Sequence, residues 1–220
     1  MALKDHSLDD KIIKAAFDEF MEFGFQKASI RKIAERAGVT HGAVYTRYNS
    51  KDALFCSIVG NYLSAVKAQS EPIGKMYYDI QQSRNVEALL EAIRKEEKIY
   101  LDILFEYYDE CILFFCRSEG SSIYDMIQKM MENKAAVTIS FLKGMSQNDI
   151  DMDGIGMIIG EQFHYYRQIL EKGYSKEKAV SCMKAVETFL EAGWKDLFER
   201  IHSRFNSNYG SILPYGMGSR

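Results

Sequence analysis

A chain of 220 residues is long enough for one or two domains with a substantial hydrophobic core. Its hydrophobic share of 47% and charged share of 27% are ordinary for a globular protein, and it has only two prolines. Long stretches rich in Ala, Leu, Lys, Glu and Met predict an all-α fold. The sequence has no apolar run of about 18 residues and no signal-peptide pattern. We therefore expect a cytoplasmic protein without a membrane segment.

Residues that would indicate catalysis or a bound metal are scattered along the chain. The four cysteines form no CxxC pair, the four histidines form no HExxH pair, and no P-loop or GxGxxG fingerprint is present. The sequence therefore predicts no catalytic residues, no metal site and no cofactor. An enzyme would have to use isolated candidates such as His164, Glu161 and Cys111.

One short segment is basic although the net charge of the chain is −3. Between Lys27 and Lys51 the sequence holds six basic residues and one acidic residue, Glu35. The rest of the chain has an acidic excess. A local basic patch on an acidic protein is typical of a small nucleic-acid footprint.

The first fifty residues predict three helices. Ile13, Ala16, Phe17 and Phe20 form the apolar stripe of a first helix, which we expect to end at Gly24. A second helix begins after Ser29 and ends at Gly38, and a third runs from His41 to about Tyr48. Two short helices joined by a glycine-containing turn form a helix-turn-helix. An ordinary helical corner is the structural alternative.

The outward-facing residues favour DNA. Small and polar groups lie at the start of the third helix, where a recognition helix presents groups to base edges. Hydroxyl and ammonium groups, together with helix N-termini, lie where phosphates would be contacted. The predicted DNA-contacting residues are Ser29, Arg31, Thr40, His41, Gly42, Ala43, Tyr45, Tyr48 and Lys51.

The stretch FGFQKASIRKIAERAGVTHGAVYTRYNSKDALF, residues 23–55, strongly resembles the DNA-binding domain of TetR/AcrR-type transcriptional regulators. The resemblance covers about residues 8–55. It implies phosphate contacts for Ser29, Tyr45 and Lys51, and a major-groove tip formed by Thr40, His41, Gly42 and Ala43. Tyr48 stands where phenylalanine is commoner in the family, so its role in the core or at a phosphate stays open.

The remainder predicts a helical body. Residues 51–70 are expected to form a connecting helix, and residues 71–85, with Pro72 and Gly74, an inter-domain boundary. A continuous helical region from Val86 to about Arg117 and a helix from Ser122 to Met145 should follow. Two further helices, 153–172 and 176–204, close the body. The predicted domains are 1–50 for DNA binding and 51–205 for effector binding and dimerisation, with 206–220 as a flexible tail.

Aromatic residues and methionines in this body suit an adaptable apolar pocket, although for each single residue a place in the core is the simpler interpretation. The candidate effector residues are Tyr100, Leu104, Tyr107, Tyr108, Cys111, Phe115, Met130, Phe141, Phe163 and His164. The family resemblance implies a four-helix dimer interface formed by the last two helices of each subunit. Its candidates are Ile155, Ile159, Phe163, Tyr166, Met183, Val186, Leu190, Trp194 and Leu197.

The leading hypothesis is a homodimeric transcriptional repressor that a small-molecule effector releases from a palindromic DNA operator. Two alternatives remain: an enzyme that uses the aromatic body as a catalytic pocket, and an architectural DNA-binding protein without an effector. A fully packed body would favour the second alternative.

Overall fold

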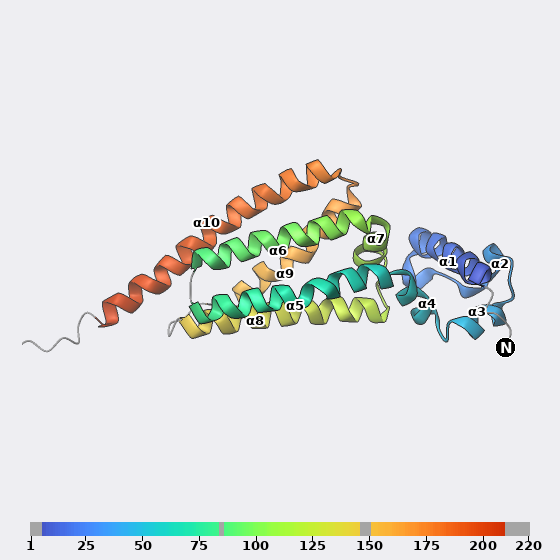
Figure 1. Ribbon diagram of the computed structural model, residues 1–220, viewed down its shortest axis with the longest axis horizontal. Helices are drawn as coiled ribbons and strands as arrows, with labels where there is room; N and C mark the ends of the chain where they lie inside the picture. The colour runs from blue at the N-terminus through green and yellow to red at the C-terminus, as the bar shows by residue number, and fades with distance from the viewer. Residues whose placement is uncertain (1–5, 84–85, 146–150, 210–220) are drawn as a thin grey trace, which may run out of the picture.

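The computed structural model describes residues 6–83, 86–145 and 151–209, and this part is all-α. Four helices form an N-terminal unit and six form an elongated helical body beside it (Figure 1). The helices of the unit are α1 (His6–Lys27), α2 (Ile30–Ala37), α3 (His41–Arg47) and α4 (Lys51–Ile58). Those of the body are α5 (Gly60–Ser83), α6 (Val86–Glu106), α7 (Tyr108–Cys116), α8 (Ser122–Met145), α9 (Met152–Glu171) and α10 (Lys176–Tyr209).

The N-terminal unit is held together by the predicted apolar stripe of α1. Phe20 is fully buried and lies among the rings of Phe25 and Phe55, with centroids 6.1 and 4.9 Å away. Gly24 has φ 70°, which favours glycine, so the chain bends there. The prediction that the helix ends at Gly24 is therefore only half right, because helical geometry resumes as far as Lys27.

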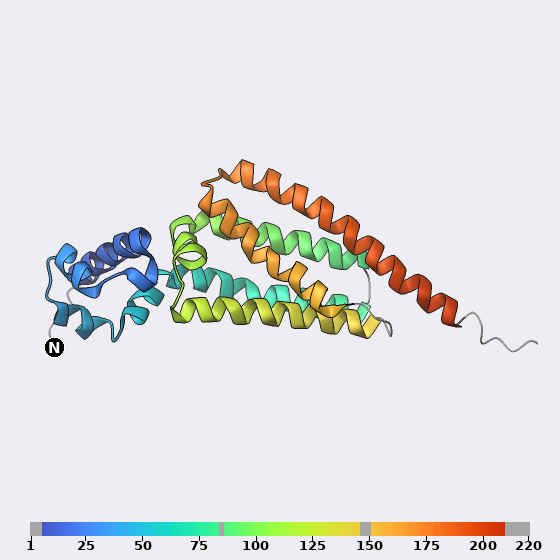
Figure 2. The ribbon, with the colours of Figure 1, turned by 180° about the vertical axis from the view of Figure 1, so that it is seen from behind.

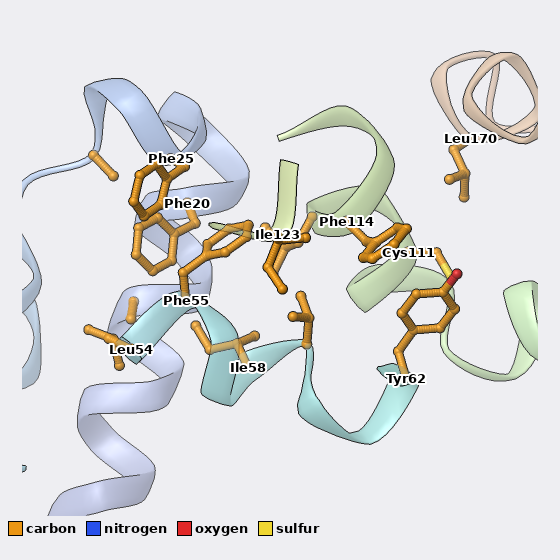
Figure 3. Packing of buried hydrophobic residues seen from close by; sticks show 14 of the residues in the cluster. Phe20, Phe25, Leu54, Phe55, Ile58, Tyr62, Cys111, Phe114, Ile123 and Leu170 are labelled. Atoms are coloured by element: carbon orange, nitrogen blue, oxygen red, sulfur yellow. The ribbon is translucent and has the colours of Figure 1, made fainter. Parts of the chain in front are cut away.

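The core runs without a break from the N-terminal unit into the body. Phe55 of α4 lies beside Ile123 of α8, and the cluster continues through Phe114 of α7 to Tyr62 of α5 (Figure 3). The rings of Tyr62 and Phe114 are in edge contact at 4.9 Å. Side chains far apart in the sequence thus form one packed cluster between the two parts.

The connecting segment differs from its prediction at both ends. The backbone leaves helical geometry at Val59, so α4 and α5 are separate helices. The predicted boundary at residues 71–85 is wrong for residues 71–83, which lie inside α5. Pro72 is exposed, whereas Ile73 and Ile80, which share one face of the helix, are buried. Packing of that face offsets the backbone hydrogen bond that proline removes. Residues 84–85 lie outside the described part.

Three helices of the body match their predictions closely. The α8 range, Ser122–Met145, is the predicted one, and α9 and α10 begin within a residue of expectation. The predicted continuous helix 86–117 is interrupted at Tyr107, which separates α6 from α7. Of the predicted flexible tail, residues 206–209 belong to α10, and residues 210–220 lie outside the described part.

Seen from behind, α9 crosses between α6 and α8, and α10 follows α6 before extending beyond it (Figure 2). Within the described ranges, no helix is long and apolar enough to cross a membrane. The same ranges contain no group of three or more metal-binding side chains.

Candidate DNA interface and effector cavity

The turn between α2 and α3 has the geometry that a helix-turn-helix needs. Gly38 adopts a left-handed conformation with φ 67° and ψ 32°, and its N–H bonds to carbonyls of the last turn of α2. The N–H of Val39 donates to the carbonyl of Ala34 at 2.9 Å. Because Ala34 is small and buried, the two helices can meet closely at this corner.

The tip of α3, residues Thr40–Ala43, faces solvent. The Thr40 side chain caps the helix by accepting the Ala43 N–H at 3.1 Å. His41 and Gly42 are exposed, and Ala43 is half-buried. The His41 ring contacts the Tyr45 ring at 4.9 Å, and Tyr45 is 41% exposed. The structure therefore brings the predicted tip residues together on a free surface.

The N-terminus of α2 is organised by a buried carboxylate. Ser29 is the N-cap residue by its extended backbone, but its side chain makes no capping bond. Its N–H donates to Glu19 of α1 at 3.1 Å, and Glu19 is only 1% exposed. This bond fixes α2 on α1 and leaves the Ser29 hydroxyl out of the cap. Arg31, in the first turn, is exposed.

Lys51 has partners within the chain that the sequence did not reveal. Its ammonium group donates to the carbonyl oxygens of Gln26 and Ala28, each at 3.2 Å. It also lies 4.6 Å from the centroid of the Phe25 ring. Partial burial lowers the pKa of Lys51. The lysine thus holds the end of α1 against the start of α4, and its phosphate contact stays a prediction.

Two of the six basic residues counted in this segment are neutralised by α1. Arg36 pairs with Glu22 at 2.9 Å and lies 3.5 Å from Glu19. Arg47 pairs with Asp9. Fewer positive charges are therefore free to contact DNA than the count of six basic residues indicates. These two arginines instead hold α2 and α3 against α1.

Tyr48 is half-buried and packs against the core cluster. Burial is the main cause that raises its pKa, with a smaller contribution from Asp9. Its ring is thus part of the packing between α3 and α4. Its phosphate contact stays a prediction.

Comparisons with known proteins agree with this geometry. Residues 12–58 match the sequence profile of the family described as bacterial regulatory proteins, tetR family. These residues form a TetR-family DNA-binding domain. It is 24% identical over 170 residues to the uncharacterized HTH-type transcriptional regulator YdgC of Bacillus subtilis, covering 74% of this chain and 81% of that one. It is 37% identical over 60 residues to the A-factor receptor protein of Streptomyces griseus, covering 27% and 22%.

Solved structures share the fold of this TetR-family chain. A TetR-like transcriptional regulator from Rhodococcus sp. RHA1 aligns with a TM-score of 0.54 at 18% identity, over 87% of this chain and 99% of that one. The fatty acid degradation regulator FadR from Bacillus halodurans aligns with a TM-score of 0.51 at 20% identity, over 84% and 98%. The family match at residues 12–58, together with the helix-turn-helix geometry, identifies the chain as a DNA-binding transcriptional regulator.

The body of the protein contains a partly open cavity of about 660 Å³. Side chains from all six helices of the body, α5 to α10, line it, and most of them are apolar. This volume is within the range of pockets that hold small organic molecules.

Half of the predicted effector residues line this cavity. They are Tyr100, Leu104, Phe115, Met130 and Phe163. Cys111 is fully buried in the core cluster, and His164 is exposed on α9. Tyr107 and Tyr108 lie half-buried at the break between α6 and α7, outside the lining. The side chain of Phe141 lies outside the described residues.

Sequence reasoning missed the contribution of α5 and the acidic end of the cavity. Tyr77 of α5 donates its hydroxyl to Glu96 of α6, and both line the cavity. Glu97, beside it, accepts a hydrogen bond from Gln162 at 3.2 Å. The two glutamates lie in the charged run RKEEK, residues 94–98, so the sequence carried no signal of their burial.

The predicted dimer residues are divided between the interior and the surface of the subunit. Ile155, Ile159, Tyr166 and Met183 are buried within the single chain. Val186, Leu190, Trp194, Leu197 and Phe163 are half-buried, and Leu190, Trp194 and Phe163 also line the cavity. The apolar groups that project outward are different ones: Met157 of α9 is 75% exposed, and Phe189 of α10 is 80% exposed.

Polar contacts join the N-terminal unit to the body. The Phe25 N–H donates to the carbonyl of Arg117 at 2.8 Å, just after α7. Asp52 of α4 bonds to Ser122, the first residue of α8. Because α8 also lines the cavity, one helix contacts both functional regions.

Proposed function

We propose that this TetR-family regulator is a homodimeric repressor that leaves a palindromic operator when a small molecule fills the cavity. The observation that carries the proposal is the cavity itself: the body is not fully packed, as it would be in an effector-free architectural protein. The proposed domains remain residues 1–50 and 51–205. The proposed location is the cytoplasm, where such a regulator meets its DNA.

The DNA-contacting role rests on the exposed tip Thr40–Ala43 and on the residues around it. A helix N-terminus with small, exposed residues can approach base edges, while hydroxyls and backbone N–H groups bind phosphates. Tyr45, at the exposed side of α3, is well placed for a phosphate. His41 is the proposed base-reading residue, because its ring lies at the front of the tip.

Dimerisation rests on the outward faces of α9 and α10. Phe189 is flanked on α10 by Ala185, Ala192 and Gly193, which are exposed and small. A protruding aromatic ring beside small residues is suited to close helix–helix contact with a second subunit. Two recognition helices would then read two half-sites, which multiplies affinity.

Release from the operator requires that the effector bind one conformation of the body more tightly than the other, since equal affinity for both would leave their populations unchanged. The helix α8 is the proposed carrier. It lines the cavity through Met130 and contacts α4 through Ser122, so a shift of α8 would move the base of the helix-turn-helix.

The proposal is tested with the purified protein and DNA from upstream of its own gene. Gel shifts should show binding that weakens with salt, and light scattering should give the mass of a dimer. His41→Ala should change sequence preference, whereas Tyr45→Phe should weaken binding to all sequences alike. Equal affinity for operator and unrelated DNA would contradict the proposal.

A further inference from the structure

One carboxylate in the cavity lacks a cationic partner. Glu97 is 8% exposed, and its hydrogen-bond partner is the neutral amide of Gln162 at 3.2 Å. Among the residues that the structure describes, no lysine, arginine or histidine lies within ion-pair distance of it. Burial is the main cause that raises the pKa of Glu97. Lys134 lies near enough to oppose this rise, but it forms its ion pair with Glu96. A buried carboxylate without an ion pair of its own is costly in an apolar cavity unless a bound cation neutralises it.

The two cations of the lining are already paired. Lys134 of α8 binds Glu96 at 3.0 Å. Arg94 of α6 lies 3.1 Å from Glu191 and 3.8 Å from Glu187, both on α10. An anionic ligand would therefore meet four lining carboxylates and displace an existing ion pair. The cavity has the opposite polarity from a carboxylate- or phosphate-binding site.

Aromatic rings are also part of the cavity wall. Tyr100, Phe163 and Tyr166 line it. The Tyr166 hydroxyl is buried without a hydrogen-bond partner in the structure. Burial first, and then the nearby charges of Glu97 and Glu96, raise its pKa. Aromatic faces attract organic cations, and the attraction grows when water is excluded.

We propose that the effector is an amphipathic organic cation, with a charged nitrogen or phosphonium centre against Glu97 and an aromatic or aliphatic body among the apolar residues. This inference rests on the proposed function and names the chemical class of the effector. Glu97 provides the charge that selects the ligand, and the tyrosine rings accept its onium group. The unpartnered Tyr166 hydroxyl can bond to a polar group of the ligand.

The test uses two probes of the same shape and opposite charge, tetraphenylphosphonium and tetraphenylborate. Calorimetry on the full-length protein should show binding of the phosphonium and at least about tenfold weaker binding of the borate. Trp194 is the chain's sole tryptophan and lines the cavity. A change in its emission therefore reports that the probe has entered this cavity.

Glu97→Gln keeps the shape of the side chain and removes its charge. It should weaken phosphonium binding at least about tenfold, because a buried charge pair loses one partner. The matched control is Glu91→Gln, an exposed glutamate on α6 outside the lining, and it should leave the affinity unchanged. Tighter binding of the borate, or equal affinity in the Glu97→Gln and parent proteins, would overturn the inference.

The same titrations separate this inference from the proposed function. Phosphonium binding that depends on Glu97 supports the cation site even if labelled operator stays bound, and that result would count against effector release. Release of operator by the borate or by a fatty acid, but not by the phosphonium, would support effector release and overturn the cation site.

Discussion

The carboxylate of Asp52 caps helix α8 by bonding twice to Ser122. One oxygen accepts the Ser122 N–H at 2.8 Å and the other accepts its hydroxyl at 2.7 Å. Asp52 lies in the first turn of α4, the helix that follows the helix-turn-helix. It therefore provides a hydrogen-bond acceptor at the N-terminus of α8, a helix that lines the cavity. A carboxylate is favoured at a helix N-terminus by the free N–H groups and the dipole.

Removal of this cap should uncouple the cavity from the DNA-binding unit. Asp52→Ala should lower the free energy of unfolding by about 1 kcal/mol, as loss of an N-cap does. Operator affinity without effector should change little, while the loss of affinity on adding effector should shrink. Denaturant unfolding and anisotropy of labelled operator measure the two effects. The control is Asp125→Ala, an exposed carboxylate in the first turn of α8; an identical effector response in both variants would count against the coupling.

Lys51 and Tyr45 should respond differently to mutation, although both are predicted phosphate contacts. Lys51→Ala removes donors to the Gln26 and Ala28 carbonyls, so it should lower stability by on the order of 1 kcal/mol. Tyr45→Phe removes only an exposed hydroxyl and should leave stability unchanged. If the lysine also contacts phosphate, its loss should change the dependence of operator binding on salt. The slope of the logarithm of the binding constant against the logarithm of salt concentration should fall in magnitude by about one. An unchanged slope would assign Lys51 a purely structural role.

Phe189→Asp should dissociate the proposed dimer. The side chain is 80% exposed in the single subunit, so the substitution leaves the fold of the subunit intact. A buried charge in an apolar helix interface is strongly unfavourable. Sedimentation should show monomers, and operator binding should fall by at least tenfold because two half-sites are no longer joined. Tyr124→Asp, at an exposed aromatic of α8, is the control. A dimeric Phe189→Asp protein would place the interface elsewhere.

Glu97 should make effector-free stability depend on pH. A raised carboxyl pKa means that the folded state holds its proton more tightly than the unfolded state. The parent should therefore lose stability relative to Glu97→Gln as pH rises above about 4.3, the ordinary glutamate pKa. Below that pH the two should be equally stable. Thermal unfolding across this pH range measures the difference, and a parent that gains stability relative to the variant as pH rises would contradict it.

The affinity for tetraphenylphosphonium should increase with pH for the same reason. The probe has a permanent charge, so only the protein titrates, and a bound cation favours ionised Glu97. Binding should tighten as pH rises through the raised pKa and then level off. Other groups face this carboxyl from the surrounding helices: Glu96 on α6, Lys134 on α8, Gln162 and Tyr166 on α9, and Glu187 on α10. Glu97→Gln should remove the dependence, which separates its titration from theirs.

The local features of the DNA-binding unit were readable from the sequence. Gly38 marks a turn that needs a positive φ, and Thr40 and Ser50 cap the helices that follow them. These features depend on residues within a few positions of one another. The all-α fold and the range of α8 were confirmed because helix periodicity and caps are local properties of the sequence. The family was confirmed because its motif lies within one continuous stretch of the chain.

Contacts between distant segments were decided only by the tertiary structure. Arg47 pairs with Asp9 and Asp52 bonds to Ser122 because the packing of whole helices brings these groups together. Pro72 is tolerated inside α5 because packing of the helix outweighs the local cost of proline. Amphipathic periodicity indicates that a helix has a buried face, but it does not tell a core from a cavity or from a second subunit. Thus the sequence could place Tyr166 and Glu97 on helices. Only the folded chain shows that both side chains line the same cavity.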